Sequence, residues 1–286
     1  MITWPTWRTL ASRSPTITRH RPYTRAELCL LGLGVSDPGD IDVRAIAHDA
    51  GATVKVRKLT NCDARIMGVN DRAIISVSED SSKQRRRFSV AHELGHWELH
   101  RGRQFECGRS DIDNAANDPL NPERQADNYA ADLLMPWYLF DPLLAQAKRV
   151  DLQLLEHIQR TFDVSPAATA IRIADANVEP VIIACYGQDG RHWFHRSKDV
   201  PDRWFPVDTL DPEGHAVDVV AGRRERTHMS PIGADAWFDV EGIRDYEVKE
   251  QSTRLSDGTA LVILRITEEA MLEDYGRRRW PAKQAR

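Results

Sequence analysis

The run from Arg87 to His100 constrains the fold of this chain more than any other stretch. It reads Arg-Phe-Ser-Val-Ala-His-Glu-Leu-Gly-His-Trp-Glu-Leu-His, with apolar residues at helical spacing. Residues four apart share one face of an α-helix, so His92 and His96 point toward the same side. The spacing predicts that both imidazoles bind one metal ion, with Glu93 close enough to reach a metal-bound water.

A chance match is the alternative interpretation of this H-E-x-x-H pattern. With ten histidines among 286 residues, such a match is expected in roughly one chain in a hundred. The motif alone therefore leaves the metal site open, and a third ligand has to come from elsewhere in the sequence.

The composition indicates a globular protein with no membrane segment. Apolar residues make up 41% and charged residues 29%, and no run of 18 apolar residues exists. The net charge of −4 gives no overall attraction to nucleic acid or to a membrane surface. The cysteines form no C-x-x-C pair, which argues against a disulfide framework and favours a cytoplasmic location; they are Cys29, Cys62, Cys107 and Cys185.

Local patterns divide the chain into four parts. Residues 1–22 contain four arginines and no acidic residue, which predicts a flexible basic extension. Residues 23–148 contain the motif helix and a small group of strands, and residues 149–177 form a helical segment. Residues 178–286 change character and read as a separate, mainly β domain. The fold class predicted for the whole chain is α+β.

Periodicity predicts the individual helices and strands. Helices are expected at 24–31, 41–50, 81–101, 122–135, 137–148, 151–162 and 165–176. Strands are expected at 53–59, 64–69, 73–77, 181–186, 191–196, 216–221, 236–240, 246–253 and 260–267. The second and third strands flank Asn70-Asp71-Arg72, which predicts a hairpin.

The third metal ligand is expected on the helix that follows a polar loop at 103–122. A catalytic zinc site uses three protein ligands and leaves one position open. Glu123 begins this Ala-rich helix, and Asp127 lies one turn further on the same face. We expect Glu123 to be the third ligand and Asp127 to accept a hydrogen bond from the other ring nitrogen of His92 or His96. An acidic pair on a solvated helix face is the alternative.

His100 continues the i, i+4, i+8 series, but we expect it to lie outside the metal site. A straight helix places it about 12 Å along the axis from His92, too far to share one ion. We assign it to helix-end capping or packing, and expect its replacement by Ala to leave metal binding intact. The other histidines show no ligand spacing and are expected to be structural.

Two motifs together resemble those of the ImmA/IrrE family of metallo-endopeptidases. The first is Arg85-Arg-Arg-Phe-Ser-Val-Ala-His-Glu-Leu-Gly-His96, and the second is Glu123-x-x-Ala-Asp-x-x-Ala-Ala-x-Leu-Leu-Met-Pro136. The resemblance covers roughly residues 40–175. It implies that residues 23–148 are a zincin-like metallopeptidase domain, built from a small sheet and active-site helices. The β-rich end is similar in placement to the GAF-like sensor domain of the IrrE branch.

The same resemblance implies roles for the site residues. The family's zinc ligands correspond to His92, His96 and Glu123, and its catalytic glutamate corresponds to Glu93. Asp127 stands where related peptidases place the acid that orients a histidine ligand. The implied cofactor is Zn²⁺, although two imidazoles and one carboxylate also accept Mn²⁺ or another divalent ion.

A protein substrate is also implied by the resemblance. Family members cut a partner repressor of the XRE helix-turn-helix class at one site, in stress responses, mobile elements or phage-related regulation. From zincin architecture, the strand at 73–77 is expected to hold the substrate along a sheet edge. DNA binding by the helix-turn-helix-like residues 155–172 is less favoured, because packing of these helices explains the same pattern. A non-catalytic, metal-bound regulator of DNA or of the repressor is the alternative function.

Overall fold

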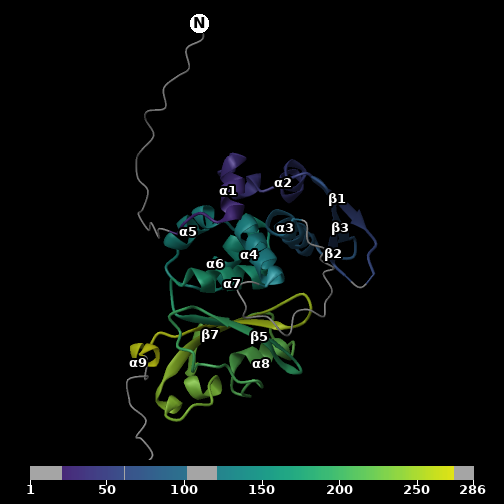
Figure 1. Cartoon of the computed structure of the whole chain (residues 1–286). Coiled ribbons are helices and arrows are strands. Elements are labelled where there is room, and N and C mark those ends of the chain that lie inside the picture. The colour runs from purple at the N-terminus through teal and green to yellow at the C-terminus, as the bar shows by residue number, and fades with distance from the viewer. Residues whose placement is uncertain (1–20, 61, 102–120, 274–286) are drawn as a thin grey trace, which may run out of the picture.

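A computed structural model of the chain describes residues 21–60, 62–101 and 121–273. The extension predicted at 1–22 and the loop predicted at 103–122 lie almost entirely outside these ranges. Within them, helices and two sheets form a mixed fold (Figure 1), and the predicted α+β fold class is confirmed.

The first half of the described chain consists of helices around one small sheet, and the second half is mainly β, as predicted. The elements of the first half are α1 (Arg25–Gly32), η1 (Pro38–Asp40), α2 (Val43–Asp49), β1 (Ala52–Arg57), β2 (Ala64–Val69), β3 (Arg72–Ser78), α3 (Lys83–Leu99), α4 (Pro122–Leu134), α5 (Trp137–Ala145), α6 (Leu152–Phe162) and α7 (Pro166–Ala176). Those of the second half are β4 (Val181–Gly187), β5 (Gly190–Arg196), α8 (His215–Val220), β6 (Ser230–Gly233), η2 (Ala234–Ala236), η3 (Ile243–Asp245), β7 (Glu247–Arg254), β8 (Ala260–Arg265) and α9 (Glu269–Leu272).

The small sheet has the strand order β1-β3-β2. β2 and β3 form the predicted antiparallel hairpin, with Val69 opposite Arg72 and Asn70 in the left-handed conformation at the turn. β1 pairs with the other side of β3 in parallel. The expectation that residues 73–77 form a substrate-binding edge is therefore wrong, because both edges of β3 are already paired. Its nearly continuous apolar run suits a central strand.

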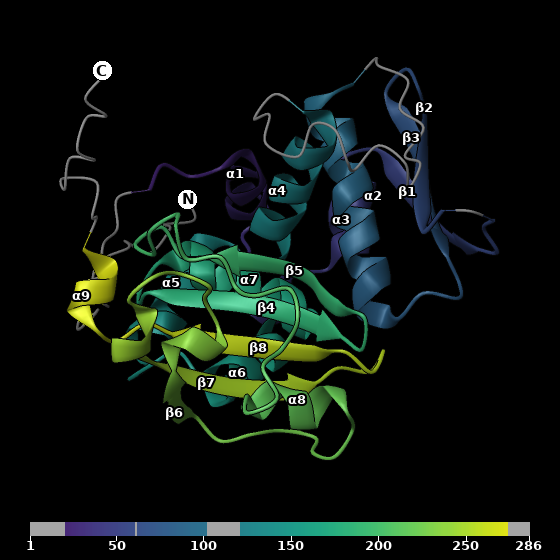
Figure 2. The same cartoon turned by 90° about the horizontal axis from the view of Figure 1, so that it is seen from below.

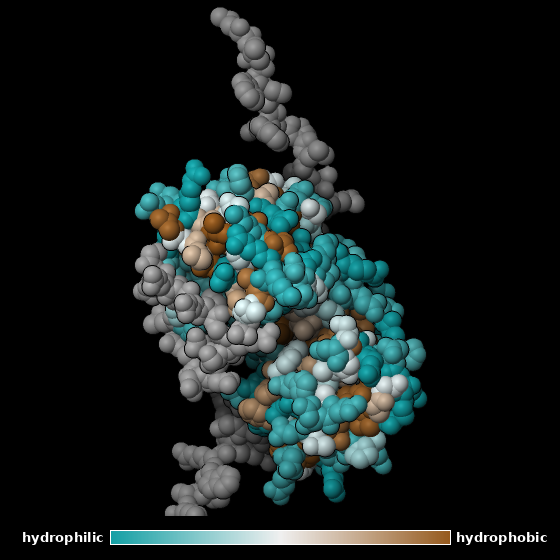
Figure 3. All heavy atoms as spheres, turned by 90° about the vertical axis from the view of Figure 1, so that its right-hand side faces the viewer, coloured by the Kyte–Doolittle hydropathy of each residue, from teal (hydrophilic) through white to brown (hydrophobic). Residues whose placement is uncertain are grey.

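The two faces of the small sheet have different surroundings. Ala73, Ile75 and Val77 point to the inner face and are buried where β3 packs against α3. Met67 and Val69 point to the outer face, where they expose 68% and 74% of their surface. Figure 3 looks onto this end of the molecule and shows apolar side chains interspersed with polar ones. These side chains of the outer face are thus exposed to solvent.

The second sheet has the strand order β5-β4-β8-β7-β6, with every neighbouring pair antiparallel. In Figure 2, α6 and α7 lie behind this sheet and α8 lies in front of it. Ile183 and Ile263 face the helices and belong to the core that continues into the first half of the chain. Ile182 and Val262 face the other way and form a second core. No helix of the described part is both long and apolar enough to cross a membrane.

The predicted strand at 216–221 is wrong, because residues 215–220 form helix α8. Ala216, Val219 and Val220 are buried, and this i, i+3, i+4 spacing fits one face of a helix. The β-branched valines suggested a strand, but burial of this helical face against the second sheet decides the structure.

The predicted strand at 236–240 is also wrong, and β6 was not predicted. Trp237 and Phe238 follow the short turn η2 and are buried in the second core. β6 contains Pro231, which lacks the N–H that a central strand needs. As the outer strand of the sheet, β6 can include this proline.

Candidate metal centre

Helix α3 places two histidines side by side. Its first turn is capped by Ser82, whose side chain accepts a hydrogen bond from the N–H of Arg85 at 3.2 Å. His92 and His96 lie one turn apart, and their Nε2 atoms are 3.1 Å from each other. His96 is 2% exposed, so the pair lies at the edge of the protein core.

A close helix crossing brings the third residue to this pair. A Cβ on Gly95 would lie 3.0 Å from the Cα of Ala126, so α4 approaches α3 at the one motif position without a side chain. Glu123 stands one turn before Ala126. The side chain of Asn121 caps α4 by accepting a hydrogen bond from the N–H of Glu123 at 3.0 Å. The end of α4 that carries Glu123 is therefore fixed against the histidines.

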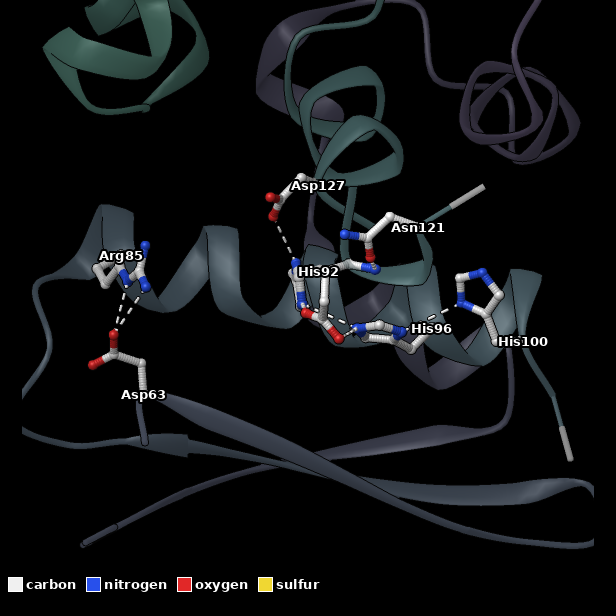
Figure 4. A network of polar contacts seen from close by, with 8 residues as sticks. Asp63, Arg85, His92, His96, His100, Asn121 and Asp127 are labelled. Carbon is white, nitrogen blue, oxygen red and sulfur yellow. Dashed lines mark hydrogen bonds and ion pairs between the residues drawn. The ribbon is translucent and has the colours of Figure 1, made fainter. Parts of the chain in front are cut away.

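The side chains of His92, His96 and Glu123 converge on one point. Figure 4 shows the rings of His92 and His96 beside each other on α3. Nε2 of His92 is 3.3 Å from Oε2 of Glu123, and Nε2 of His96 is 3.3 Å from Oε1 of the same carboxylate. Among the described residues, this is the one group of three or more His, Cys, Asp or Glu side chains close enough to hold a metal ion.

The three residues fit a divalent metal ion. A tetrahedral ion with bonds of about 2.0–2.1 Å keeps its ligand atoms about 3.3 Å apart, close to the separations seen here. Hydrogen bonds from His92 and then His96 hold the pKa of Glu123 well below its ordinary value, so this ligand is an anion. Two imidazoles and one carboxylate are also a donor set that zinc accepts.

Glu93 lies beside the three candidate ligands and is 1% exposed. Its Oε2 atom is buried and has no hydrogen-bond partner within the described part of the chain. Burial raises the pKa of Glu93, whereas the neighbouring His92 and His96 lower it. A buried carboxylate oxygen without a donor fits a site that receives a water molecule or substrate from outside.

Each of the two histidines also has a contact on its other ring nitrogen. Nδ1 of His92 lies 2.8 Å from Oδ1 of Asp127, the acid that the sequence places one turn after Glu123. Nδ1 of His96 lies 3.3 Å from Nδ1 of His100. The structure thus brings every predicted site residue to one place, and adds His100 to their surroundings.

One residue of this neighbourhood was missed by sequence reasoning. Gln125, two residues after Glu123, places its Oε1 atom 2.8 Å from Nε2 of His100. Helical spacing groups Glu123 with Asp127 and leaves Gln125 on another face. The available signal was His100 itself, a buried histidine that needs polar partners.

The α+β fold thus carries a cluster, His92, His96 and Glu123, that could hold a metal ion. Residues 40–174 match the model of the family Peptidase_M78, described as an IrrE N-terminal-like domain. The solved structure of a Mycobacterium tuberculosis transcriptional regulator has a similar fold, with a TM-score of 0.58 and 17% sequence identity. That match covers 87% of this chain and 78% of the regulator. No protein of curated function matches the chain.

Proposed function

We propose that this chain is a metal-dependent endopeptidase that cuts a partner repressor of the XRE helix-turn-helix class at one site. Cleavage relieves repression in a stress response, a mobile element or a phage-related circuit. The observation that carries the proposal is the buried carboxylate of Glu93 beside the cluster of His92, His96 and Glu123. Peptide hydrolysis uses a general base next to an ion site, whereas binding alone does not require one.

Each site residue has a defined role in this mechanism. His92, His96 and Glu123 hold the ion, which we propose to be Zn²⁺, with Mn²⁺ as the second candidate. When bound, a divalent ion polarises the scissile carbonyl and makes water more acidic. Glu93 accepts a proton from the attacking water and passes it to the leaving amine. Asp127 keeps the ring of His92 in its binding orientation.

A free edge of the small sheet supports a binding mode for the main chain of the substrate. β2 is an outer strand of this sheet and packs against α3. The ring of Trp97, the residue after His96, fills the space beside Gly68 of β2. An extended peptide added to β2 would therefore run alongside the motif helix. We propose pairing along β2 in place of the pairing along β3 that the fold excludes.

The outer face of the small sheet supports docking of a folded protein partner. Its exposed apolar residues include Met67, Val69 and Ile74. Its outward-facing basic side chains are exposed and have no ion pair with any described residue; they are Lys55, Arg57, Arg65 and Arg72. A repressor surface that combines carboxylates with apolar side chains would complement this face.

A non-catalytic, metal-bound regulator that binds DNA or the repressor is the alternative function. The similarity in fold to a transcriptional regulator is the observation that favours it. Glu93 argues against it, because a buried carboxylate with an unpartnered oxygen costs free energy that binding does not repay. The alternatives differ in one result, since Glu93→Gln abolishes regulation by an endopeptidase and leaves regulation by a binding protein unchanged.

We also propose a cytoplasmic location and a division of the chain into domains. The cysteines of the described chain are free thiols, which supports the cytoplasm as the location. We propose a peptidase domain at 23–148 and a helical segment at 149–177 packed on it. Residues 178–286 are then a regulatory or sensor domain, with a GAF-like fold as the candidate.

The test uses the full-length protein loaded with Zn²⁺ or Mn²⁺ and each XRE-class repressor encoded beside its gene. We expect one discrete cut, which a chelator or Glu93→Gln abolishes. Glu98→Gln is the matched control, because Glu98 lies on the same helix but pairs with Arg25 outside the cluster. Intact repressors after incubation with the metal-loaded wild type would reject the proposed substrate.

A further inference from the structure

A buried series of contacts runs from Gln125 through His100 to His96. Nε2 of His100 lies 2.8 Å from Oε1 of Gln125, and Nδ1 of His100 lies 3.3 Å from Nδ1 of His96. His100 is 7% exposed and His96 is 2% exposed, so little water can replace these contacts. Figure 4 shows the ring of His100 beside that of His96, at the end of α3.

The positions of the protons follow from the chemistry of the three groups. The amide oxygen of Gln125 only accepts, so Nε2 of His100 carries the proton of that contact. A neutral imidazole has a single N–H, which leaves Nδ1 of His100 as an acceptor. An ion bound at Nε2 of His96 leaves Nδ1 as the position for the single proton of this ring, so in the metal-bound site His96 donates from Nδ1 to Nδ1 of His100. Without the ion, Nε2 of His96 faces the carboxylate of Glu123 and donates to it instead.

We propose that Gln125 and His100 form a relay that fixes the tautomer of His96, and that His100 is a positioning residue of the metal site. This inference rests on the proposed function, because it needs His96 to bind an ion through Nε2. The relay does for His96 what Asp127 does for His92. His100 lies too far along the helix to be a ligand, and it acts through the ligand instead.

Helix capping does not explain why residue 100 is a histidine. The residue is the C-cap of α3, and its backbone N–H donates to the carbonyl of His96 at 2.9 Å. Any residue except proline can supply that bond. The imidazole adds two contacts that the cap does not use, one to the next helix and one to a candidate ligand.

A neutral relay suits this side of the site. Glu93 and Glu123 already place two carboxylates near His96. A third carboxylate in the core beside them would add charge repulsion and carry a cost of desolvation. Asp127 avoids that cost because 56% of its side chain is exposed.

Metal affinity and the histidine tautomer together test the relay. We expect His100→Ala and Gln125→Leu to weaken Zn²⁺ binding about 10–100-fold, measured on the full-length protein by competition with a chelator. His100→Asn should recover much of the loss, because its amide oxygen can accept from Nδ1 of His96. A weakened but persisting metal affinity in His100→Ala would revise the expectation from the sequence that this replacement leaves metal binding intact. His157→Ala on α6 is the matched control and should bind like wild type.

The tautomer of His100 provides a readout that packing alone would not change. Long-range ¹H–¹⁵N spectra of the zinc-loaded, ¹⁵N-histidine protein should show His100 protonated at Nε2 in wild type, and exchanging between its two tautomers in Gln125→Leu. Protonation of His100 at Nδ1 in wild type would overturn the relay, as would wild-type affinity in both His100→Ala and Gln125→Leu. If the variants lose zinc affinity as expected, the relay is supported even when the wild type cuts no repressor. Failure of the proposed substrate can therefore be told apart from failure of the relay.

Discussion

Gly95 packs against Ala126 so closely that a side chain at position 95 would lie 3.0 Å from the Cα of Ala126. This contact sets the distance between α3 and α4. It thereby sets the distance between the two histidines and Glu123, whose separations of 3.3 Å suit one shared ion. A residue with no side chain thus determines the geometry of the candidate site.

Gly95→Ala should push the two helices apart and weaken the metal site. Alanine in a helix interior is favoured over glycine by about 0.5–1 kcal/mol, but overpacking costs about 1–3 kcal/mol. We expect a lower free energy of unfolding in a urea titration and weaker Zn²⁺ binding in chelator competition. Gly32→Ala on α1 is the control, because nothing lies within 4 Å of the added Cβ. Wild-type zinc affinity in Gly95→Ala would contradict the role assigned to this contact.

Asp127→Ala should weaken Zn²⁺ binding about 10–100-fold, because Oδ1 of Asp127 accepts the proton on Nδ1 of His92 at 2.8 Å. Asp127→Asn keeps an acceptor oxygen and should lose less affinity. Chelator competition on both variants checks this order, with the exposed Asp80→Asn as the control. Equal losses in Asp127→Asn and Asp127→Ala would show that hydrogen-bond acceptance is not the contribution of Asp127.

Asp163 should stabilise the fold at neutral pH and stop doing so in acid. Burial raises its pKa, but hydrogen bonds from Lys83 and Gln84 and the charge of Arg87 outweigh burial and hold the pKa below its ordinary value. Such a carboxyl adds stability above its unfolded pKa of about 3.9, and loses it as the pH falls through the folded pKa.

Asp163→Asn tests this pH dependence without disturbing the backbone, because Asn also tolerates the φ of +52° at this C-cap. We expect the variant to lose about 0.5–1 kcal/mol of unfolding free energy at pH 7, a size typical of exposed ion pairs. Urea titrations between pH 7 and pH 3 should show this difference shrinking toward zero. A difference independent of pH would contradict a role for the charge.

Reversing the charge of the open sheet face should affect the folded repressor and spare a short substrate. We expect Arg65→Glu combined with Arg72→Glu to raise KM for the repressor, because like charges then oppose an acidic partner. Cleavage of a short peptide that spans the cut site should be unchanged. Arg244→Glu, at a side chain 87% exposed in the second half of the chain, is the matched control. An unchanged KM for the repressor in the double variant would remove this face from substrate recognition.

Local spacing was enough to predict which residues of the candidate site the structure brings together. His92 and His96 lie four apart on one helix, and Glu123 and Asp127 lie four apart on another, so each pair could be assigned from the sequence. The angle and distance between the helices depend on the contact at Gly95, which is not local. For that reason the contacts of His100 with His96 and Gln125 could not be predicted.

The errors in the predicted fold also come from contacts that are not local in the sequence. Residues 73–77 were correctly predicted as a strand, but their central position depends on β1, which precedes them by about twenty residues and pairs on the other side. Residues 216–221 contain three β-branched valines, yet their burial against the second sheet favours a helix. β6 was not predicted because it contains Pro231, and proline is rare inside strands. An outer strand of a sheet can include proline, and β6 has that position.

The most direct test of this account is the amount of metal bound by the purified full-length protein, measured by elemental analysis after dialysis against Zn²⁺. We predict one equivalent in wild type and in Glu93→Gln, because Glu93 serves as a base and not as a ligand. His92→Ala, His96→Ala and Glu123→Ala should each retain almost none. Zinc retained at one equivalent in Glu123→Ala, or lost in Glu93→Gln, would contradict the assignment of this centre.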